Sequence, residues 1–474
     1  MSSTLLLPGF TGTTLPAWLE RRLHDGLGGV CLFGMNIVSP EQLAELCAAI
    51  YAANPTAIIA IDEEGGDVSR LYQAQGSPFP GNAVLGRLDD AELTARVGTQ
   101  VGWELRLAGV GLTLAPDADV NSNPLNPVIG VRSFGTDPSD VARHVSAWTR
   151  GIEATGVASC AKHFPGHGDT AADSHHALPV IDVDEATLHA RELVPFRAAI
   201  AAGARTIMTS HIVVPSLDPE NPATFSSHIL RRLLRGDLGF EGVIVTDALD
   251  MAGASGDRGI PAAAVAAVSA GADLLCIGTR NTDEQLTDIL TALDAAVSTG
   301  TLPSDVIETA AVRVRSLGEE LARGRREIPV PEHLETGVVP GLTVAEVAAS
   351  FFVSDAASEL LARSAGRPLT WVELATTDNM AVGDAPWGPF AAEVTPSTAI
   401  DEGGLAIAVG KDLQRHPAAR ETIAKLRSQG DVLVVEMGWP DPSLEDVDIA
   451  TYGASRLVGV ALIQLIGRDK CVSE

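Results

Sequence analysis

The segment AKHFPGHGDTAADSHHALP, residues 161–179, concentrates groups that can transfer protons, and it follows an apolar run. Within it, Asp173 and His175 alternate across Ser174, so an extended turn can aim both side chains into one site. A carboxylate bonded to one imidazole nitrogen fixes the tautomer and raises the histidine pKa, which prepares the other nitrogen for proton transfer. This pair therefore indicates an acid/base device carried on a loop.

Two other interpretations of the same segment stay open. Its histidines could hold zinc, but the spacing is not that of an HExxH helix, so the signal for a metal is weak and we expect none. The segment could also be a solvated polar loop without chemistry.

Short apolar runs alternate with amphipathic helical stretches from residue 29 to about residue 300. Continuous rather than alternating hydrophobicity is typical of parallel strands that are covered on both faces. Seven or eight strand–helix units in roughly 300 residues favour a TIM-type (β/α)8 barrel over an open sheet. The predicted strands lie near residues 29–34, 56–62, 109–120, 157–164, 205–211, 241–248 and 272–278.

Ionisable side chains stand at the ends of five of these runs and not at their beginnings. The carboxyl ends of all strands in a parallel barrel open on one rim, where active sites form. The sequence therefore predicts one site that collects groups from five strands. These groups are Asp62, Asp117, Asp119, Lys162, His163, His211 and Asp247.

A second, smaller unit is expected after the barrel. Residues 324–342 are rich in proline and glycine and predict a linker between a catalytic barrel at 1–323 and a C-terminal α/β sandwich domain at 343–474. Buried strands are predicted at LTWVEL, GLAIAVG and DVLVVEMG, with a helix near 416–428. We expect no cluster of ionisable groups at these strand ends that is comparable to the one on the barrel. A structural or dimerising role is therefore favoured, and contact with the substrate is left open.

Composition limits the partners and the location of the chain. A net charge of −28 over 474 residues disfavours nucleic acid and anionic membrane surfaces. The five cysteines are scattered in apolar runs and predict buried free thiols. No run approaches the ~20 apolar residues of a spanning helix, and the first residues lack the basic start of a signal peptide, so a cytoplasmic protein without a cofactor is expected.

Four motifs together resemble glycoside hydrolase family 3. They are Asp-x-Glu-Gly-Gly at 62–66, GVRSFG at 130–135, KHFPGHGDT with DSH at 162–175, and TDALDM at 246–251. The resemblance runs from residue 29 to about residue 300 in the family's order, and the histidine-rich motif is specific to its β-N-acetylglucosaminidase branch. The C-terminal part is similar to the second domain of two-domain members, less specifically.

The resemblance implies a role for each matching residue. Asp247 would be the nucleophile, and His175 with Asp173 the general acid/base. The role of His211 is left open near the pocket, and Met251 is expected at the substrate. Sugar hydroxyls and the N-acetyl group would be bound by Asp62, Arg70, Arg132, Lys162 and His163.

Two positions depart from the family pattern. Asp67 stands where the family usually has an arginine after Gly-Gly, which removes a positive charge near the pocket mouth. Asp250 stands where many members have serine, which puts the substrate contacts around it in doubt.

The activity implied is that of a retaining exo-β-N-acetylglucosaminidase, which removes terminal β-linked N-acetylglucosamine from small carbohydrates such as muropeptides or chito-oligosaccharides. A phosphorylase is the main alternative, because a neutral histidine repels an incoming phosphate less than a carboxylate does. A sugar-binding protein without catalysis, a metal-dependent hydrolase and a plain β-glucosidase are less favoured by the motifs.

Overall fold

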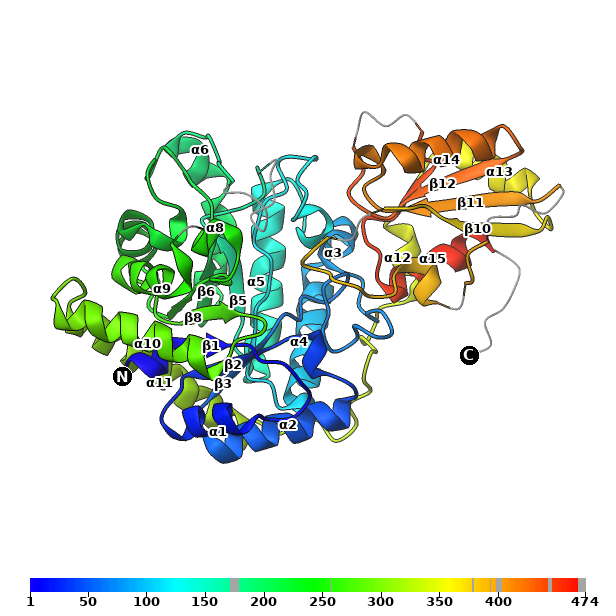
Figure 1. Ribbon diagram of the computed structural model, residues 1–474. Coiled ribbons are helices and arrows are strands. Elements are labelled where there is room, and N and C mark those ends of the chain that lie inside the picture. Colours follow the sequence, from blue (N-terminus) through cyan, green and yellow to red (C-terminus); the bar gives the residue numbers. More distant parts are fainter. Residues whose placement is uncertain are drawn as a thin grey trace.

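The computed structural model describes residues 1–170, 179–256, 258–376, 379–392, 394–397, 403–441 and 446–467. Asp173 and His175, the predicted acid/base pair, lie outside these ranges. Among the described residues no helix is both long and apolar enough to cross a membrane. Figure 1 shows a larger N-terminal body, in which helices surround a group of central strands, and a smaller C-terminal body beside it.

The central strands of the N-terminal body are short, parallel and fully buried. They form three sheets with the orders β1-β8, β2-β3-β4 and β5-β6-β7. Strands β2 to β8 fall within the seven apolar runs predicted to be strands, whereas β1 was not predicted. The strands are β1 (Leu6–Pro8), β2 (Gly29–Leu32), β3 (Ile58–Ile61), β4 (Leu112–Thr113), β5 (Cys160–Phe164), β6 (Thr206–Thr209), β7 (Val243–Val245) and β8 (Leu275–Gly278).

Isolated bridges join these three sheets to one another. Leu112 pairs with Ala158 in parallel, which links β4 to the approach of β5. Val245 pairs with Leu274, which links β7 to β8. The parallel strands therefore follow one another in chain order from β2 to β8 and on to β1, and all their carboxyl ends lie on the same side. The described residues give no ladder between β1 and β2.

Helices on the outside cover these strands, and their first turns are capped as the sequence leads one to expect. The side chains of Ser39, Asp90 and Asp137 accept bonds from backbone N–H groups of the helices that follow them. The helices are α1 (Ala17–His24), α2 (Pro40–Ala53), α3 (Asn82–Leu88), α4 (Ala91–Ala108), α5 (Pro138–Ala154), α6 (Glu185–Ala190), α7 (Leu193–Ala201), the π-helix η5 (His228–Asp237), α8 (Ala252–Ser255), α9 (Gly259–Ala270), α10 (Asp283–Ser298) and α11 (Ser304–Glu327).

Helices α4 and α5 pack closely through glycine. A Cβ on Gly98 would lie 2.7 Å from the Trp148 carbonyl oxygen, and one on Gly151 would lie 2.3 Å from that of Ala95. Side chains at these two positions would push the helices apart. Helix α4 precedes β4 in the chain and α5 precedes β5, and the ends of these two strands carry much of the site.

The C-terminal body contains a five-stranded sheet in the order β10-β11-β12-β13-β9, in which only β9 is antiparallel to its neighbour. The predicted strands at LTWVEL, GLAIAVG and DVLVVEMG are confirmed as β10, β11 and β12, and the helix near 416–428 as α14. The elements are α12 (Val344–Ala349), β9 (Phe352–Val353), α13 (Asp355–Arg363), β10 (Leu369–Glu373), β11 (Leu405–Gly410), α14 (Pro417–Arg427), β12 (Val432–Glu436), β13 (Ile449–Ala450) and α15 (Arg456–Ile466).

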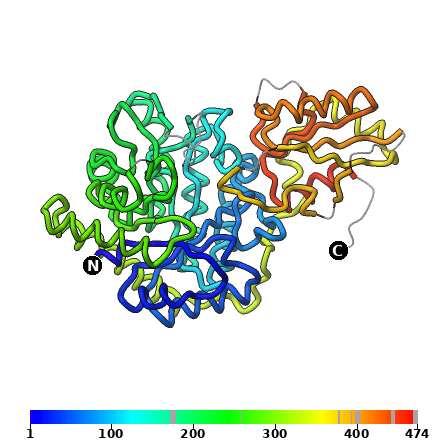
Figure 2. Tube along the Cα trace, in the orientation of Figure 1, coloured from blue at the N-terminus to red at the C-terminus, as the bar shows by residue number. Residues whose placement is uncertain are grey.

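The chain passes between the two bodies along one side, which the continuous trace in Figure 2 makes easy to follow. After α11 ends at Glu327, no helix or strand forms until α12 begins at Val344. Four of the five cysteines lie in the described chain, and all four are free and buried, as predicted. Cys471 is outside the described residues.

Candidate functional site

The residues predicted for the site follow the carboxyl ends of different strands. Asp62 comes directly after β3, Lys162 and His163 lie within β5, and Asp247 follows β7. Arg132 is in the short 3-10 helix η3 (Gly130–Arg132) of the long connection after β4. The structure therefore brings side chains from distant parts of the sequence to one side of the strands.

A buried network of opposite charges occupies the region between β3 and β5. Lys162 Nζ donates to Asp62 Oδ1 at 2.9 Å and lies 2.7 Å from Glu64 Oε1. The guanidinium of Arg132 binds Glu64 through two parallel bonds of 3.0 and 2.7 Å. Such paired geometry orients a guanidinium more strictly than a single contact does. The network fixes two cations that were predicted to bind the sugar.

Glu64 is the centre of this network. Burial alone would raise its pKa, but the charges of Arg132 and Lys162 outweigh burial and hold the pKa of Glu64 well below its usual value. No role was predicted for this residue from the sequence. Its position two residues after Asp62 was the available signal, because side chains two apart in an extended segment point to the same side.

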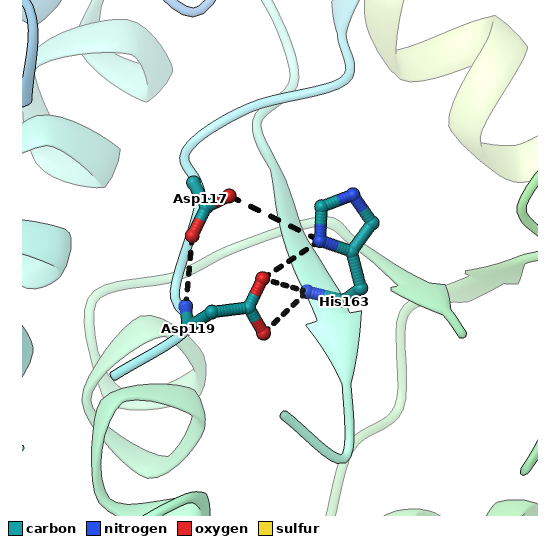
Figure 3. Close-up of side chains that lie close together, drawn as sticks. All are labelled: Asp117, Asp119 and His163. Carbon is teal, nitrogen blue, oxygen red and sulfur yellow. Dashed lines mark hydrogen bonds and ion pairs between the residues drawn. The ribbon is translucent and has the colours of Figure 1, made fainter. Parts of the chain in front are cut away.

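Asp117, Asp119 and His163 form a second cluster, shown in Figure 3. Asp119 accepts bonds from the His163 backbone N at 3.2 Å and the His167 backbone N at 2.6 Å, and its Oδ2 lies 2.7 Å from His163 Nδ1. The other ring nitrogen of His163 points away from both carboxyl groups in Figure 3. Asp119 therefore holds the His163 ring in one orientation and leaves that nitrogen available to a ligand.

The pKa values of the two aspartates in this cluster are shifted in opposite directions. Burial and the neighbouring charge of Asp119 raise the pKa of Asp117 well above its usual value. For Asp119, burial is outweighed by the charge of His163 and by its bonds, so the pKa of Asp119 is lowered. The two carboxyl groups therefore titrate as a coupled pair, in which Asp119 has the lower pKa and Asp117 the higher one.

The donor set of this cluster does not fit a metal ion. One atom from each of Asp117, Asp119 and His163 lies within 4.8 Å of the others. Both oxygens of Asp119 already accept N–H bonds, and Arg132 Nη2 lies 3.8 Å from Asp117 Oδ2. A divalent cation here would have to sit beside the guanidinium of Arg132, whose positive charge repels it.

Asp247 is half-buried at the end of β7. Its backbone N donates to the Thr209 carbonyl at 3.3 Å, and its Oδ1 accepts the Ala248 N–H at 2.7 Å. These bonds hold the carboxylate against the strand end. The negative charge of Asp247 is among those that act on His167, whose pKa is nevertheless lowered to about 4 by burial.

His211 contacts the segment that follows Asp247, and Met251 belongs to that segment. The ring of His211 is buried, with Nδ1 at 2.9 Å from Thr224 Oγ1 and Nε2 at 3.1 Å from the Ala248 carbonyl. It therefore supports the segment that follows Asp247, and its direct contact with a sugar stays a prediction. Met251 is 8% exposed and precedes α8, so its contact with a substrate also stays a prediction.

The start of the histidine-rich loop is held from one side by Arg191. This residue bonds Asp169 Oδ2 at 2.5 Å and Glu192 Oε1 at 2.6 Å. Glu192 is fully buried, and its other oxygen has no hydrogen-bond partner among the described residues. A Cβ on Gly166, whose φ is +129°, would come within 2.8 Å of that oxygen, so the loop needs glycine at this point.

Replacing Glu192 by glutamine is expected to flatten the pH dependence of stability. Burial raises the pKa of Glu192 from 4.5 to about 7 although the charge of Arg191 opposes it. The folded chain therefore keeps a proton that the unfolded chain releases. The resulting stabilisation is fully present below about pH 4.5 and is lost as the pH rises through about 7, with a slope of up to ~1.4 kcal/mol per pH unit.

Urea unfolding of the parent and of Glu192→Gln between about pH 5 and pH 8 measures this slope. Glutamine keeps a carbonyl oxygen for Arg191, so the contact survives while the titration disappears. Parallel pH curves for the two proteins would show that Glu192 does not titrate in this range.

The C-terminal body contacts the site directly. The guanidinium of Arg70 donates to the carbonyls of Ala381 at 2.6 Å and Val382 at 3.0 Å, and lies 3.9 Å from Asp62 Oδ2. Arg70 therefore links the predicted sugar site to a loop more than 300 positions further along the chain. A small cleft lies between the two bodies, lined by Arg132 and residues 126–131 on one side and by Asn379 and Lys411 on the other.

Strand ends in the C-terminal body carry ionisable side chains, although fewer than the strand ends of the N-terminal body. Lys411 and Asp412 follow β11, and Glu436 ends β12, where its carboxyl accepts the backbone N–H groups of Asp412 and Leu413 at 2.7 Å. Burial, followed by the charge of Asp412, raises the pKa of Glu436 to about 8. The acidic residue was missed because it lies inside the apolar run VLVVEM, which predicts only a buried strand.

Comparisons with known proteins agree with this arrangement. The glycosyl hydrolase family 3 N-terminal domain matches residues 16–317. A β-hexosaminidase A from Pseudoalteromonas piscicida is 35% identical over 344 residues, which are 67% of this chain and 58% of that protein. A β-hexosaminidase from Stenotrophomonas maltophilia is 39% identical over 286 residues, which are 58% of this chain and 83% of that protein.

A solved structure resembles the chain over nearly its whole length. The family 3 β-N-acetylglucosaminidase from Paenibacillus sp. is 30% identical with a TM-score of 0.84, covering 99% of this chain and 96% of that one. Parallel strands whose carboxyl ends gather acids and bases, together with these matches, define a glycoside hydrolase. The chain belongs to glycoside hydrolase family 3.

Proposed function

We propose that the protein is a retaining exo-β-N-acetylglucosaminidase that removes terminal β-linked N-acetylglucosamine from a small carbohydrate such as a muropeptide or a chito-oligosaccharide. The names of the relatives support this substrate. The observation that carries the proposal is the carboxylate of Asp247 at the end of β7, on the same side of the strands as the Asp62–Lys162 ion pair and His163.

The chemistry assigned to these residues is a double displacement. Asp247 attacks the anomeric carbon while His175, oriented by Asp173, protonates the leaving oxygen, and a covalent glycosyl-enzyme forms. The same histidine then deprotonates water, which attacks the anomeric carbon and releases Asp247. This acid/base pair is assigned from the sequence motif, because it lies outside the described residues.

The remaining groups recognise the sugar. Asp62 can accept bonds from sugar hydroxyls, while Lys162, Arg132 and Arg70 donate. Each charged hydrogen bond of this type contributes about 1.5–3 kcal/mol. Since Glu64 and Asp119 hold these donors and His163 in place before a ligand arrives, little ordering is left for binding to impose.

Trapping with an activated 2-fluoro sugar tests the nucleophile. A fluorine beside the anomeric centre slows the second displacement, so the glycosyl-enzyme accumulates, and peptide mapping then locates the label. We expect the label on Asp247. A label on another carboxylate would overturn this assignment, and the absence of any covalent adduct in a protein that cleaves the matching aryl glycoside would overturn the double displacement.

A second assay identifies whether water or phosphate accepts the sugar in the second displacement. With water as acceptor, the product is free N-acetylglucosamine, and its rate of release is expected to be the same in phosphate and in a non-phosphate buffer. Release of sugar 1-phosphate, at a rate that rises with phosphate concentration, would assign phosphorolysis instead. Identifying the product by mass separates the two outcomes in one experiment.

We also propose that the parallel strands β1–β8 close into a TIM-type barrel. The bridges between β4 and β5 and between β7 and β8, and the bond from Gly28 N to the Ser3 carbonyl, support closure. With it we propose a catalytic unit at 1–323, a linker at 324–342 and a C-terminal α/β sandwich at 343–474. A hydrophobic cluster on the face of β10, β11 and β12 that α14 covers is built wholly from residues 372–434, which supports this division.

A further inference from the structure

Asn126 joins two loops of the site through one buried amide. Its side chain is 4% exposed. The Nδ2 group lies 2.8 Å from the His167 carbonyl, 3.0 Å from the Gly168 carbonyl and 3.3 Å from Thr170 Oγ1. All three acceptors belong to the stretch that leads from β5 into residues 171–178.

The oxygen atom of the same amide holds the loop that carries Arg132. Oδ1 of Asn126 accepts the backbone N–H groups of Val128 and Ile129, each at 2.9 Å. Arg132 then closes on the same turn, with its backbone N bonded to the Ile129 carbonyl at 2.9 Å and its Nη1 to the Val128 carbonyl at 3.2 Å. The amide therefore uses its donor side on one loop and its acceptor side on the other.

The C-terminal body braces the same turn. Asn379 Nδ2 donates to the Val128 carbonyl at 2.9 Å, so this oxygen accepts from Asn379 and from Arg132. A displacement of Val128 would change both the position of the Arg132 guanidinium, which is predicted to bind the sugar, and the contact between the two bodies. Asn126 lies between this turn and the histidine-rich stretch.

We propose that Asn126 is a positioning residue of the reaction, which fixes His167–Thr170, and through them the entry to the acid/base segment, relative to Arg132. The inference rests on the proposed glycosidase function. No other side chain of this size carries both a two-hydrogen donor and an acceptor on so short a stem. Aspartate keeps the acceptor side alone, while alanine also leaves the N–H groups of Val128 and Ile129 buried without a partner.

Asn126→Asp isolates the donor side and is the variant to measure. The observable is kcat/KM, which reports the first displacement, for aryl N-acetyl-β-glucosaminides whose leaving groups differ in acidity. A dinitrophenolate leaves with little help from an acid, whereas a phenolate needs the proton. We expect a loss of about 3-fold for the dinitrophenyl compound and at least about 30-fold for the phenyl compound, within the range that general acid catalysis supplies.

Asn123→Asp is the matched control. It makes the same substitution three positions earlier on the same loop, where the amide nitrogen makes one long contact within the described chain, to the Thr170 carbonyl at 3.5 Å. Its losses are expected to be small and equal across the series. Equal losses across the series for Asn126→Asp would reduce its role to a structural one and overturn the proposal. A parent protein that cleaves no member of the series would contradict the proposed function instead.

Hydrogen exchange tests the positioning without relying on activity. In Asn126→Asp, amide exchange in peptides covering residues 163–170 should rise at least about 5-fold while peptides covering β7 keep their rate, because local opening is governed by the contacts that hold each segment. Thermal unfolding establishes that the variant is folded. Unchanged exchange at residues 163–170 in the folded variant would overturn the proposal whatever its kinetics show.

Discussion

Asp247→Ala is expected to lower kcat/KM for an aryl N-acetyl-β-glucosaminide by at least about 10⁴-fold, the scale found when a catalytic nucleophile is removed. The bonds to Asp247 explain why no neighbour replaces it. Its backbone is fixed to the Thr209 carbonyl, and its carboxylate is oriented by the Ala248 N–H at 2.7 Å. Water entering the space left by the side chain would lack both the charge and this orientation.

A control variant and a rescue experiment with azide accompany Asp247→Ala. Asp250→Ala removes an exposed carboxylate three positions away, whose Oδ2 accepts the Thr279 N–H at 3.2 Å, and it should keep activity within about 10-fold. Azide added to Asp247→Ala should restore turnover of an activated aryl glycoside, because a small anion can occupy the emptied position. Activity near that of the parent in Asp247→Ala would end the assignment of the nucleophile.

The ends of the strands could be predicted from the sequence because the pattern that marks them lies within a few consecutive residues. A buried parallel strand is a continuous apolar run, and the polar residue that follows it must lie on the rim. The positions of Asp62 and Asp247 follow from this rule alone, whereas Lys162 and His163 lie within the last residues of β5. The strands β11 and β12 could be located in the same way, whereas β10 (LTWVE) alternates buried and less buried residues, as a strand at the edge of a sheet does.

The partners of these residues could not be predicted, because they are far apart in the chain. Glu64 meets Arg132 across 68 positions, and Asn126 meets His167 across 41. Arg70 meets Ala381 across 311 positions. No periodic pattern within one element encodes such pairs. The contact of Arg70 with the C-terminal body could not be predicted for this reason, although its strands β10, β11 and β12 could be located.

The opposite pKa shifts of Asp117 and Asp119 could not be predicted from the sequence either. As two carboxylates at one strand end they look equivalent in the sequence. The charge of His163 and the bonds from His163 and His167 lower the pKa of Asp119, whereas burial and the charge of Asp119 raise the pKa of Asp117. Neighbouring acids whose pKa values are pushed apart are how a site obtains different functions from one residue type. Only the assembled contacts decide which aspartate takes which form.

Glu64→Ala is expected to destabilise the protein by about 3 kcal/mol and to raise KM. Removing one member of a buried ion network leaves uncompensated charge, which costs about 3–5 kcal/mol. Here the charges of Arg132 and Lys162, whose side chains are 5% and 3% exposed, lose their common partner. Asp117 Oδ2 stays 3.8 Å from Arg132 Nη2 and Asp62 stays bonded to Lys162, so we expect the lower end of this range.

Denaturant unfolding measures the loss of stability, and steady-state kinetics the change in KM. Glu63→Gln is the matched control, because Glu63 is equally buried but its Oε2 accepts the backbone N–H groups of Arg70 and Leu71 at 2.9 Å, which a glutamine oxygen also accepts. Its cost should stay below about 1.5 kcal/mol, the scale of one neutral hydrogen bond. Equal costs for the two variants would mean that the ion network adds nothing beyond burial, and an unchanged KM in Glu64→Ala would mean that Arg132 and Lys162 hold their positions without it.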